Sequence, residues 1–273
     1  MRKNKSALLS VPYIIFMVVF TLIPLGVVAY YALTDPDTGA FTLNNLSNLT
    51  TYLPVFGQSV FYSLVSALIC LILGYPVAYF IAHRGKTLQK ILYMLVMLPM
   101  CMSFLLRTLA WVGLLQDTGI INNFLDAIGI GRLQLIRTPG AVILGMVYNY
   151  LPYMILPLYA ILVKIDDRLI EAAEDLGCNG VQTFLKVVLP LSVPGILSGI
   201  TMVFVPAVST FYISQKLGNT DTTVLIGDLI ERQFKQADNP NLGAALSLVL
   251  MALVFLCTGI MNRFGGDEEG VVV

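Results

Sequence analysis

The chain has 273 residues, of which 57% are hydrophobic and only 12% are charged, and its mean hydropathy is +0.82. Soluble domains carry about 25% charged residues, so this composition excludes a soluble globular protein, a disordered chain and a disulfide-built secreted domain. The 16 basic and 16 acidic residues leave no net charge, which argues against nucleic acid as a partner, because phosphate binding needs surplus Lys and Arg. The composition predicts a protein that crosses a lipid bilayer several times.

Six stretches are apolar and long enough to cross a bilayer, which takes roughly 20 residues of helix. They cover residues 6–34, 59–83, 91–115, 138–163, 187–215 and 239–262. Only the third holds a charge well inside it, Arg107. Six buried helices of a soluble protein are the alternative, which the low charge disfavours. The sequence therefore predicts an all-α integral membrane protein with six transmembrane helices.

Lys and Arg are more frequent in cytoplasmic loops than in outer ones. If the N-terminus is inside, ten basic residues fall in cytoplasmic segments and five in outer loops. We therefore expect both termini in the cytoplasm. The expected division is a first helix with its outer loop (1–58), a membrane domain of five helices (59–263) and a cytoplasmic tail (264–273).

The loop between the fourth and fifth spans predicts a short helix at the cytoplasmic surface. Asp166 or Asp167 can cap its start, and Gly177 can adopt the left-handed conformation that ends a helix. Apolar residues recur at helical spacing between them, at Leu169, Ala172, Ala173 and Leu176. A second helix can begin at Asn179 and run into the fifth span. The short helix, Asp166–Gly177, suits insertion into a cleft of another protein, and a solvated connector is the alternative.

The spacing within residues 166–190 resembles the EAA loop of ABC importer permeases. Glu171-Ala172-Ala173 is followed after three residues by Gly177, and after nine more by Val-Val-Leu-Pro, with Val187 where the family pattern has Ile. In that family the loop forms a coupling helix that sits in a groove of the ATP-binding subunit. The resemblance implies a coupling role for Glu171, Ala172, Ala173, Glu174, Gly177, Leu189 and Pro190.

The resemblance extends along most of the chain. Residues 74–82, 98–111, 147–160, 205–214 and 225–234 are similar to spermidine/putrescine ABC transporter permeases of the PotB type. It implies the type I ABC importer permease fold and half of a translocation path in the inner membrane of a prokaryote. The implied partners are a second permease of the PotC type, two copies of an ATP-binding subunit and an extracytoplasmic solute-binding protein. Another small solute, or a stand-alone channel or secondary carrier, is the alternative.

No motif predicts chemistry in this chain. Gly85-Lys86-Thr87 resembles the end of a phosphate-binding loop, but Phe80 stands where that pattern requires Gly. The sequence has no H-E-x-x-H, no Cys/His ligand set and no G-x-S-x-G, so an integral membrane enzyme is disfavoured. We expect no catalytic residue, no metal site and no bound cofactor, with ATP used by a partner subunit.

A polyamine path should offer carboxylates for ammonium groups and aromatic faces for cation–π contact. An arginine at a helix centre costs about 2.5–3.5 kcal/mol on insertion scales. Arg107 therefore either lines a water-filled path, or lies off-centre and snorkels, or braces a backbone carbonyl. For each aromatic candidate, bundle packing or an interfacial belt is the alternative. The candidates are Trp111, Asp117, Tyr148, Tyr150, Tyr153 and Tyr212.

The fourth and fifth spans carry residues that shape helix packing. The G-x3-G pattern at Gly195 and Gly199 predicts close contact with another helix. Prolines within these spans predict kinks, which could carry motion from the coupling loop to the path. They are Pro152, Pro157, Pro190, Pro194 and Pro206.

Overall fold

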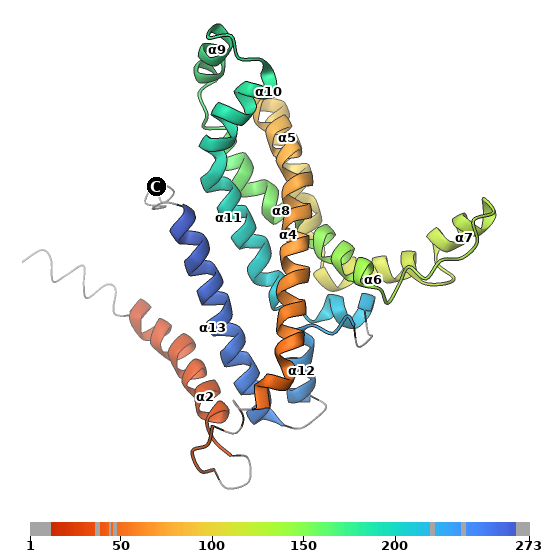
Figure 1. Ribbon diagram of the computed structural model, residues 1–273, viewed down its shortest axis with the longest axis vertical. Helices are drawn as coiled ribbons and strands as arrows, with labels where there is room; N and C mark the ends of the chain where they lie inside the picture. Colours follow the sequence, from red (N-terminus) through yellow and green to blue (C-terminus); the bar gives the residue numbers. More distant parts are fainter. Residues whose placement is uncertain are drawn as a thin grey trace, which may run out of the picture. The chain divides into compact units, whose positions relative to one another are not determined.

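The computed structural model describes residues 12–35, 39–43, 45, 48–218, 222–235 and 239–265. These residues form helices joined by short connections, together with an isolated antiparallel bridge between Thr34 and Phe41 (Figure 1). In this part of the chain six helical stretches are long and apolar enough to cross a bilayer, which confirms the predicted all-α membrane fold. They are Pro12–Ala32, Leu49–Ala82, Phe104–Ala127, Pro139–Leu162, Gly180–Val208 and Pro240–Met261.

The chain divides into two compact units that are discontinuous in sequence. The first contains residues 1–54 and 229–253, and the second contains residues 55–228 and 254–273. The three domains expected from the sequence stay a prediction. Residues 6–11 of the expected first span and residues 266–273 of the expected tail lie outside the described residues.

The first unit is built around small residues and a polar contact. A π-helical turn, η1 (Val18–Leu22), leads into α2 (Ile23–Ala32). Ala32 packs in a small core with Ala244 and Ala245 of α13 (Pro240–Gly265). The Nδ2 atom of Asn241 donates to the carbonyl oxygen of Thr34 at 2.6 Å, so the end of α2 is tied to the start of α13.

Three long helices form the core of the second unit: α4 (Leu53–Ala82), α8 (Pro139–Leu162) and α11 (Leu189–Val208). The contact between α8 and α11 is the most extensive of any helix pair in the described chain. A Cβ atom added at Gly199 would lie 2.6 Å from Met154 Sδ, and one at Gly195 would lie 3.0 Å from Ile161 Cγ1. The close contact expected from the G-x3-G pattern is therefore confirmed.

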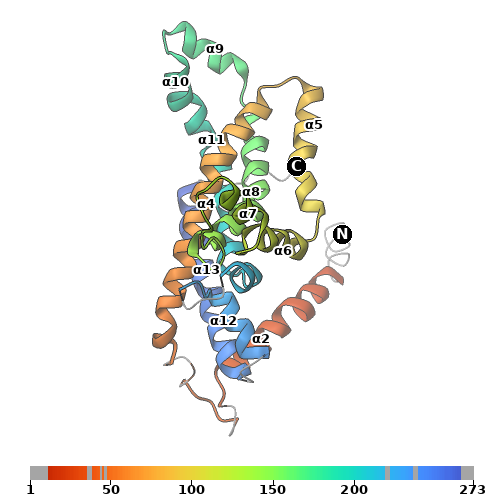
Figure 2. The same cartoon turned by 90° about the vertical axis from the view of Figure 1, so that its right-hand side faces the viewer.

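The third expected span is not one helix. Residues 91–115 were expected to be continuous, but α5 (Lys86–Met97) gives way to a 3-10 turn, η3 (Leu98–Cys101), before α6 (Phe104–Leu115) begins. Pro99 lacks the N–H that would continue the ladder, and Met102 has an extended backbone with ψ 148°. Figure 2 shows α6 and α5 with clearly different directions. The break places Arg107 in the first turn of a new helix.

The fifth expected span also differs at its C-terminal end. The stretch 187–215 was expected to be helical, but α11 ends at Val208. Pro206 removes a backbone donor near this end, and the hydroxyl of Ser209 donates to the carbonyl oxygen of Val205 at 3.1 Å. A π-helical turn, η5 (Ser214–Gly218), and then α12 (Ile226–Lys235) follow. The segment after α11 is therefore folded into short helices.

Candidate functional site

The predicted surface helix is present as α9 (Asp167–Asp175). The carboxylate of Asp166 accepts from the backbone N–H of Arg168 at 3.0 Å, so the expected N-terminal cap is confirmed. Gly177 has φ +87°, the left-handed conformation expected of it. Its N–H donates to Glu174 at 2.8 Å, and the N–H of Cys178 donates to Ala173 at 3.0 Å. These bonds close the helix and fix the turn that follows.

The two alanines at the centre of α9 have different surroundings. The sequence placed Leu169, Ala172, Ala173 and Leu176 on one apolar stripe. Ala173 is buried, at 7% exposure, whereas Ala172 is exposed and Leu176 is 86% exposed. Ala173 therefore holds α9 against its own chain, while Leu169, Ala172 and Leu176, at positions i, i+3 and i+7, form an outward apolar face. Glu171 and Glu174 are also exposed.

The helix after this turn joins α9 to the core without a break. Asn179 and Gln182 form a reciprocal capping box at the start of α10 (Gly180–Thr183). A π-helical turn, η4 (Phe184–Val188), then connects α10 to α11, which confirms the expected helix from Asn179 into the fifth span. Leu189 and Pro190 begin α11. Pro190 cannot donate a backbone hydrogen bond to the preceding turn. The wider π turn before it accommodates this missing bond within the helix.

Arg107 is buried, at 6% exposure, on the face of α6 that packs toward the rest of the second unit. Its Nε and Nη1 atoms are buried and make no hydrogen bond to the described residues. Tyr150 of α8 lies close enough to interact electrostatically with Arg107, and its hydroxyl donates to the carbonyl oxygen of Pro206 at 3.3 Å. Nothing in the described chain supports the bracing of a carbonyl by Arg107 directly.

The aromatic candidates fall into separate pairs. Trp111 packs edge-on against Tyr148, with 5.4 Å between ring centroids, and Tyr150 and Tyr153 lie 6.2 Å apart in a similar arrangement. The third group is Tyr212, whose ring lies 6.3 Å from that of Phe104. These rings pack where α6, α8 and the segment leading into η5 meet. The structure brings Arg107 and Tyr150 together, but it does not gather all the candidates around one pocket.

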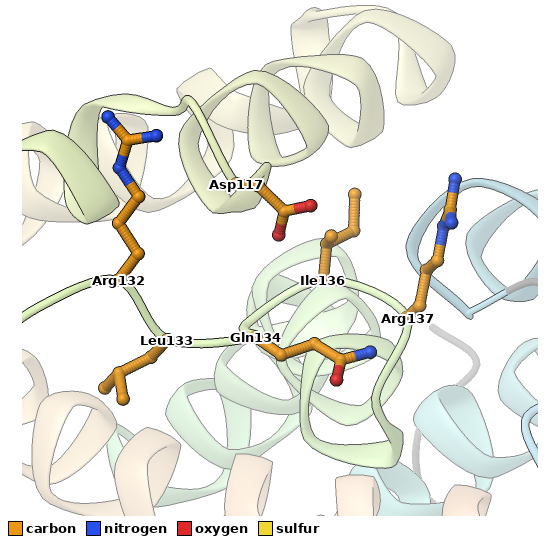
Figure 3. A pocket seen from close by; sticks show the side chains of 6 residues that line it. All are labelled: Asp117, Arg132, Leu133, Gln134, Ile136 and Arg137. Carbon is orange, nitrogen blue, oxygen red and sulfur yellow. The ribbon is translucent and has the colours of Figure 1, made fainter.

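Asp117 lies at a depression of about 270 Å³ beyond the end of α6. Figure 3 shows its carboxylate beside Ile136, with Arg132 and Arg137 on either side of it. Arg132 and Arg137 line the same depression, and their positive charges disfavour the binding of an ammonium group there. Asp117 is therefore a weaker candidate for a cation ligand than its position in the sequence suggested.

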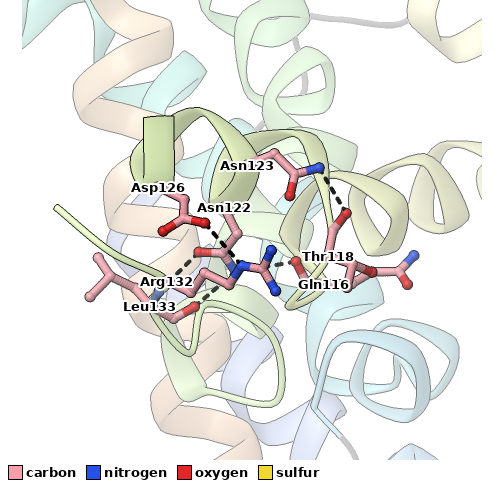
Figure 4. A network of polar contacts seen from close by, with 7 residues as sticks. All are labelled: Gln116, Thr118, Asn122, Asn123, Asp126, Arg132 and Leu133. Atoms are coloured by element: carbon pink, nitrogen blue, oxygen red, sulfur yellow. Dashed lines mark hydrogen bonds and ion pairs between the residues drawn. The ribbon is translucent and has the colours of Figure 1, made fainter. Parts of the chain in front are cut away.

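Asn122 organises the loop after α6, and sequence reasoning did not identify it. It is fully buried at the first turn of α7 (Ile120–Ala127). Its Nδ2 atom donates to the carbonyl oxygens of Gln116 (3.2 Å) and Leu133 (2.9 Å), and its Oδ1 accepts from Leu133 N–H at 3.0 Å (Figure 4). Arg132 and Asp126 form an ion pair at 3.5 Å beside it. The partners are up to 11 residues away, so no local pattern could reveal them.

A buried carboxylate in the loop after α11 was also missed. Asp228 is 1% exposed, and its Oδ1 accepts from Gln215 Nε2 at 2.8 Å. It ties the start of α12 to η5. Among the described residues no group of His, Cys, Asp or Glu is arranged to hold a metal ion.

Comparison with known proteins identifies the family of the chain. Residues 74–265 match the family described as "Binding-protein-dependent transport system inner membrane component". The chain belongs to this family. The matched residues include the surface helix α9, the α8–α11 core and the broken third span. These features therefore belong to the membrane component of a transport system.

Curated relatives match the permease over most of its length. It is 37% identical over 272 residues to the spermidine/putrescine transport system permease protein PotB of Haemophilus influenzae, covering 95% of this chain and 94% of that one. It is 35% identical over 250 residues to PotB of Escherichia coli K12, covering 88% and 90%. The inner membrane ABC transporter permease YdcU of the same organism is 30% identical over 240 residues, covering 83% and 75%.

Solved structures share the fold of the permease. A chain of a bacterial ABC transporter that imports the acidic polysaccharide alginate has a TM-score of 0.83 at 18% identity, covering 98% of this chain and 97% of that one. A chain of the MetNI methionine ABC transporter has a TM-score of 0.57 at 18% identity, covering 78% and 94%. The fold is that of an ABC importer permease.

Proposed function

We propose that this permease forms half of the translocation path of an ATP-driven importer for spermidine and putrescine. The assignment of the substrate rests on the 35–37% identity to PotB permeases over 88–95% of the chain. The aromatic pairs Trp111–Tyr148 and Tyr150–Tyr153 supply faces for methylene stems and ammonium groups. A permease for another small solute is the alternative.

The outward apolar face of α9, formed by Leu169, Ala172 and Leu176, is the proposed docking surface for an ATP-binding subunit. Its exposure supports this role, because a short apolar face beside water has no partner within its own chain. Gly177 and the capping box keep the face at a fixed angle to α11. Glu171 and Glu174 flank the face and add polar contacts at its rim.

The complete importer, in this proposal, contains two permeases, two ATP-binding subunits and an extracytoplasmic solute-binding protein. The second permease is of the PotC type. Both termini of this chain lie in the cytoplasm, on the same side as α9, and ATP hydrolysis resides in the ATP-binding subunits. The chain itself supplies half of the translocation path and the coupling helix α9, and it catalyses no reaction.

Uptake into vesicles tests this function. The complex is reconstituted with its solute-binding protein, and ATP is enclosed on the side of α9. We expect accumulation of labelled spermidine that requires ATP and is competed by unlabelled putrescine. Accumulation without ATP would indicate a channel or secondary carrier. ATP hydrolysis that responds to a different solute and not to polyamines would indicate the alternative importer.

A further inference from the structure

We propose that α4 transmits the movement of the coupling loop to the outer loop 222–226. Phe184 makes the contact at the cytoplasmic end of α4, and Gln58 and Tyr62 make the contact at the outer end. This inference rests on the proposed function, because it requires a coupling loop that an ATP-binding subunit moves. It assigns a positioning role to residues that contact neither nucleotide nor solute.

At the cytoplasmic end, Phe184 lies against two tyrosines of α4. Its ring is edge-on to Tyr75 at 5.5 Å and to Tyr79 at 5.9 Å between centroids. Edge-to-face pairs at this separation contribute about 0.5–1.5 kcal/mol beyond the area that they bury. Phe184 is the first residue of the π turn that joins α10 to α11. Any displacement of α9 and α10 therefore reaches α4 through this ring.

The same contact supports a weak point of α4. Pro76 lies inside this helix and removes one of its backbone hydrogen bonds. Tyr75 and Tyr79 lie on either side of Pro76 in the sequence, and Phe184 touches both. The hydroxyl of Tyr75 is also bonded to Ser192 of α11 at 2.7 Å. These contacts stiffen the helix on both sides of Pro76, so that it moves as a rigid body and does not bend at the proline.

At the outer end, α4 holds residues 222–226, which lead into α12. Gln58 Nε2 and the Tyr62 hydroxyl both donate to the carbonyl oxygen of Thr222, the latter at 3.0 Å. Ser59 is fully buried, and its hydroxyl oxygen accepts from the backbone N–H of Ile226 at 2.8 Å. These donors and acceptors come from the second and third turns of α4, about 25–32 Å from Tyr79 at 1.5 Å per residue. One helix thus contacts the coupling loop and the outer loop.

The experiment measures the outer loop while nucleotide acts on the inner side. In the reconstituted complex the four native cysteines are replaced by serine and Thr222→Cys is introduced. Its reaction with a membrane-impermeant maleimide is compared with and without a non-hydrolysable ATP analogue. Phe184→Ala breaks the cytoplasmic contact, and Gln58→Ala, Ser59→Ala and Tyr62→Phe together break the outer one. Leu185→Ala, the exposed neighbour on the same π turn, is the matched control.

We expect nucleotide to change the labelling rate in the parent and in Leu185→Ala, and to have no effect in either contact variant. Spermidine transported per ATP hydrolysed should fall about ten-fold in both contact variants. Cross-linking from Ala172→Cys to the ATP-binding subunit should persist, because docking is untouched. Labelling that still responds to nucleotide after loss of the outer contact overturns the inference, even if Phe184→Ala fails to assemble. Absence of the cross-link from Ala172→Cys in a complex with both α4 contacts intact refutes the proposed function instead.

Discussion

The same substitution, made separately at the adjacent residues Ala172 and Ala173, distinguishes an effect on docking to the ATP-binding subunit from an effect on folding. Ala173 is 7% exposed and Ala172 is exposed on the outward face of α9. Ala173→Asp would bury a carboxylate with no partner, which costs several kcal/mol even after relaxation. Ala172→Asp places the same group in water, where surface substitutions stay within about 0.5 kcal/mol.

We therefore expect Ala172→Asp to unfold at the parent temperature and to lose co-purification with the ATP-binding subunit. Ala173→Asp should lower the melting temperature by about 5 °C or more, since each kcal/mol shifts a chain of this size by roughly 2–4 °C. The assays are thermal unfolding in detergent and capture on an affinity-tagged ATP-binding subunit. Normal capture of a stable Ala172→Asp variant would refute the assignment of the outward face.

Three further substitutions test other parts of the structure. Asn122→Ala should lower the free energy of unfolding by about 2–3 kcal/mol, because three hydrogen bonds disappear and leave the backbone of Leu133 unpaired. Hydrogen exchange at the Leu133 amide measures this loss, and unchanged protection of that amide would contradict it. Gly227→Ala should destabilise by about 1–3 kcal/mol, because its Cβ would meet the backbone oxygens of Ser209 and Thr210. Gly26→Ala, which meets nothing within 4 Å, is the control in the same thermal assay, and equal melting temperatures would refute the close contact. Arg107→Met should leave stability unchanged or raised, since the guanidinium has buried atoms without hydrogen bonds, while spermidine uptake falls; a large loss of stability would instead indicate a bracing role.

Local signals in the sequence predicted local structure well. The cap at Asp166, the left-handed Gly177 and the helix from Asn179 each depend on a few neighbouring residues, and all three are confirmed. The close approach at Gly199 is confirmed as well, because only a missing side chain admits Met154 there. The break after Met97 was missed although Pro99 was visible, since a proline in an apolar run can kink a helix or end it.

Features that depend on distant partners could not be predicted. Periodicity placed Ala173 with Ala172, but the burial of Ala173 depends on how α9 folds back on its own chain. The role of Asn122 depends on Leu133, and that of Tyr62 depends on Thr222, 160 residues away. Arg107 was recognisable as a charge in a span, but the lack of hydrogen bonds at its buried Nε and Nη1 atoms follows from the packing of α6.

The central claim is that α9 is a lever driven by an ATP-binding subunit, and cross-linking from α9 during transport tests it most directly. A photoreactive residue at position 172, with a matched one at Leu185, is activated in vesicles that are importing labelled spermidine. We expect position 172 to capture the ATP-binding subunit, and this capture to stop uptake, while position 185 captures far less. Spermidine uptake that continues at its full rate after complete cross-linking at position 172, or capture that never includes the ATP-binding subunit, would contradict the claim.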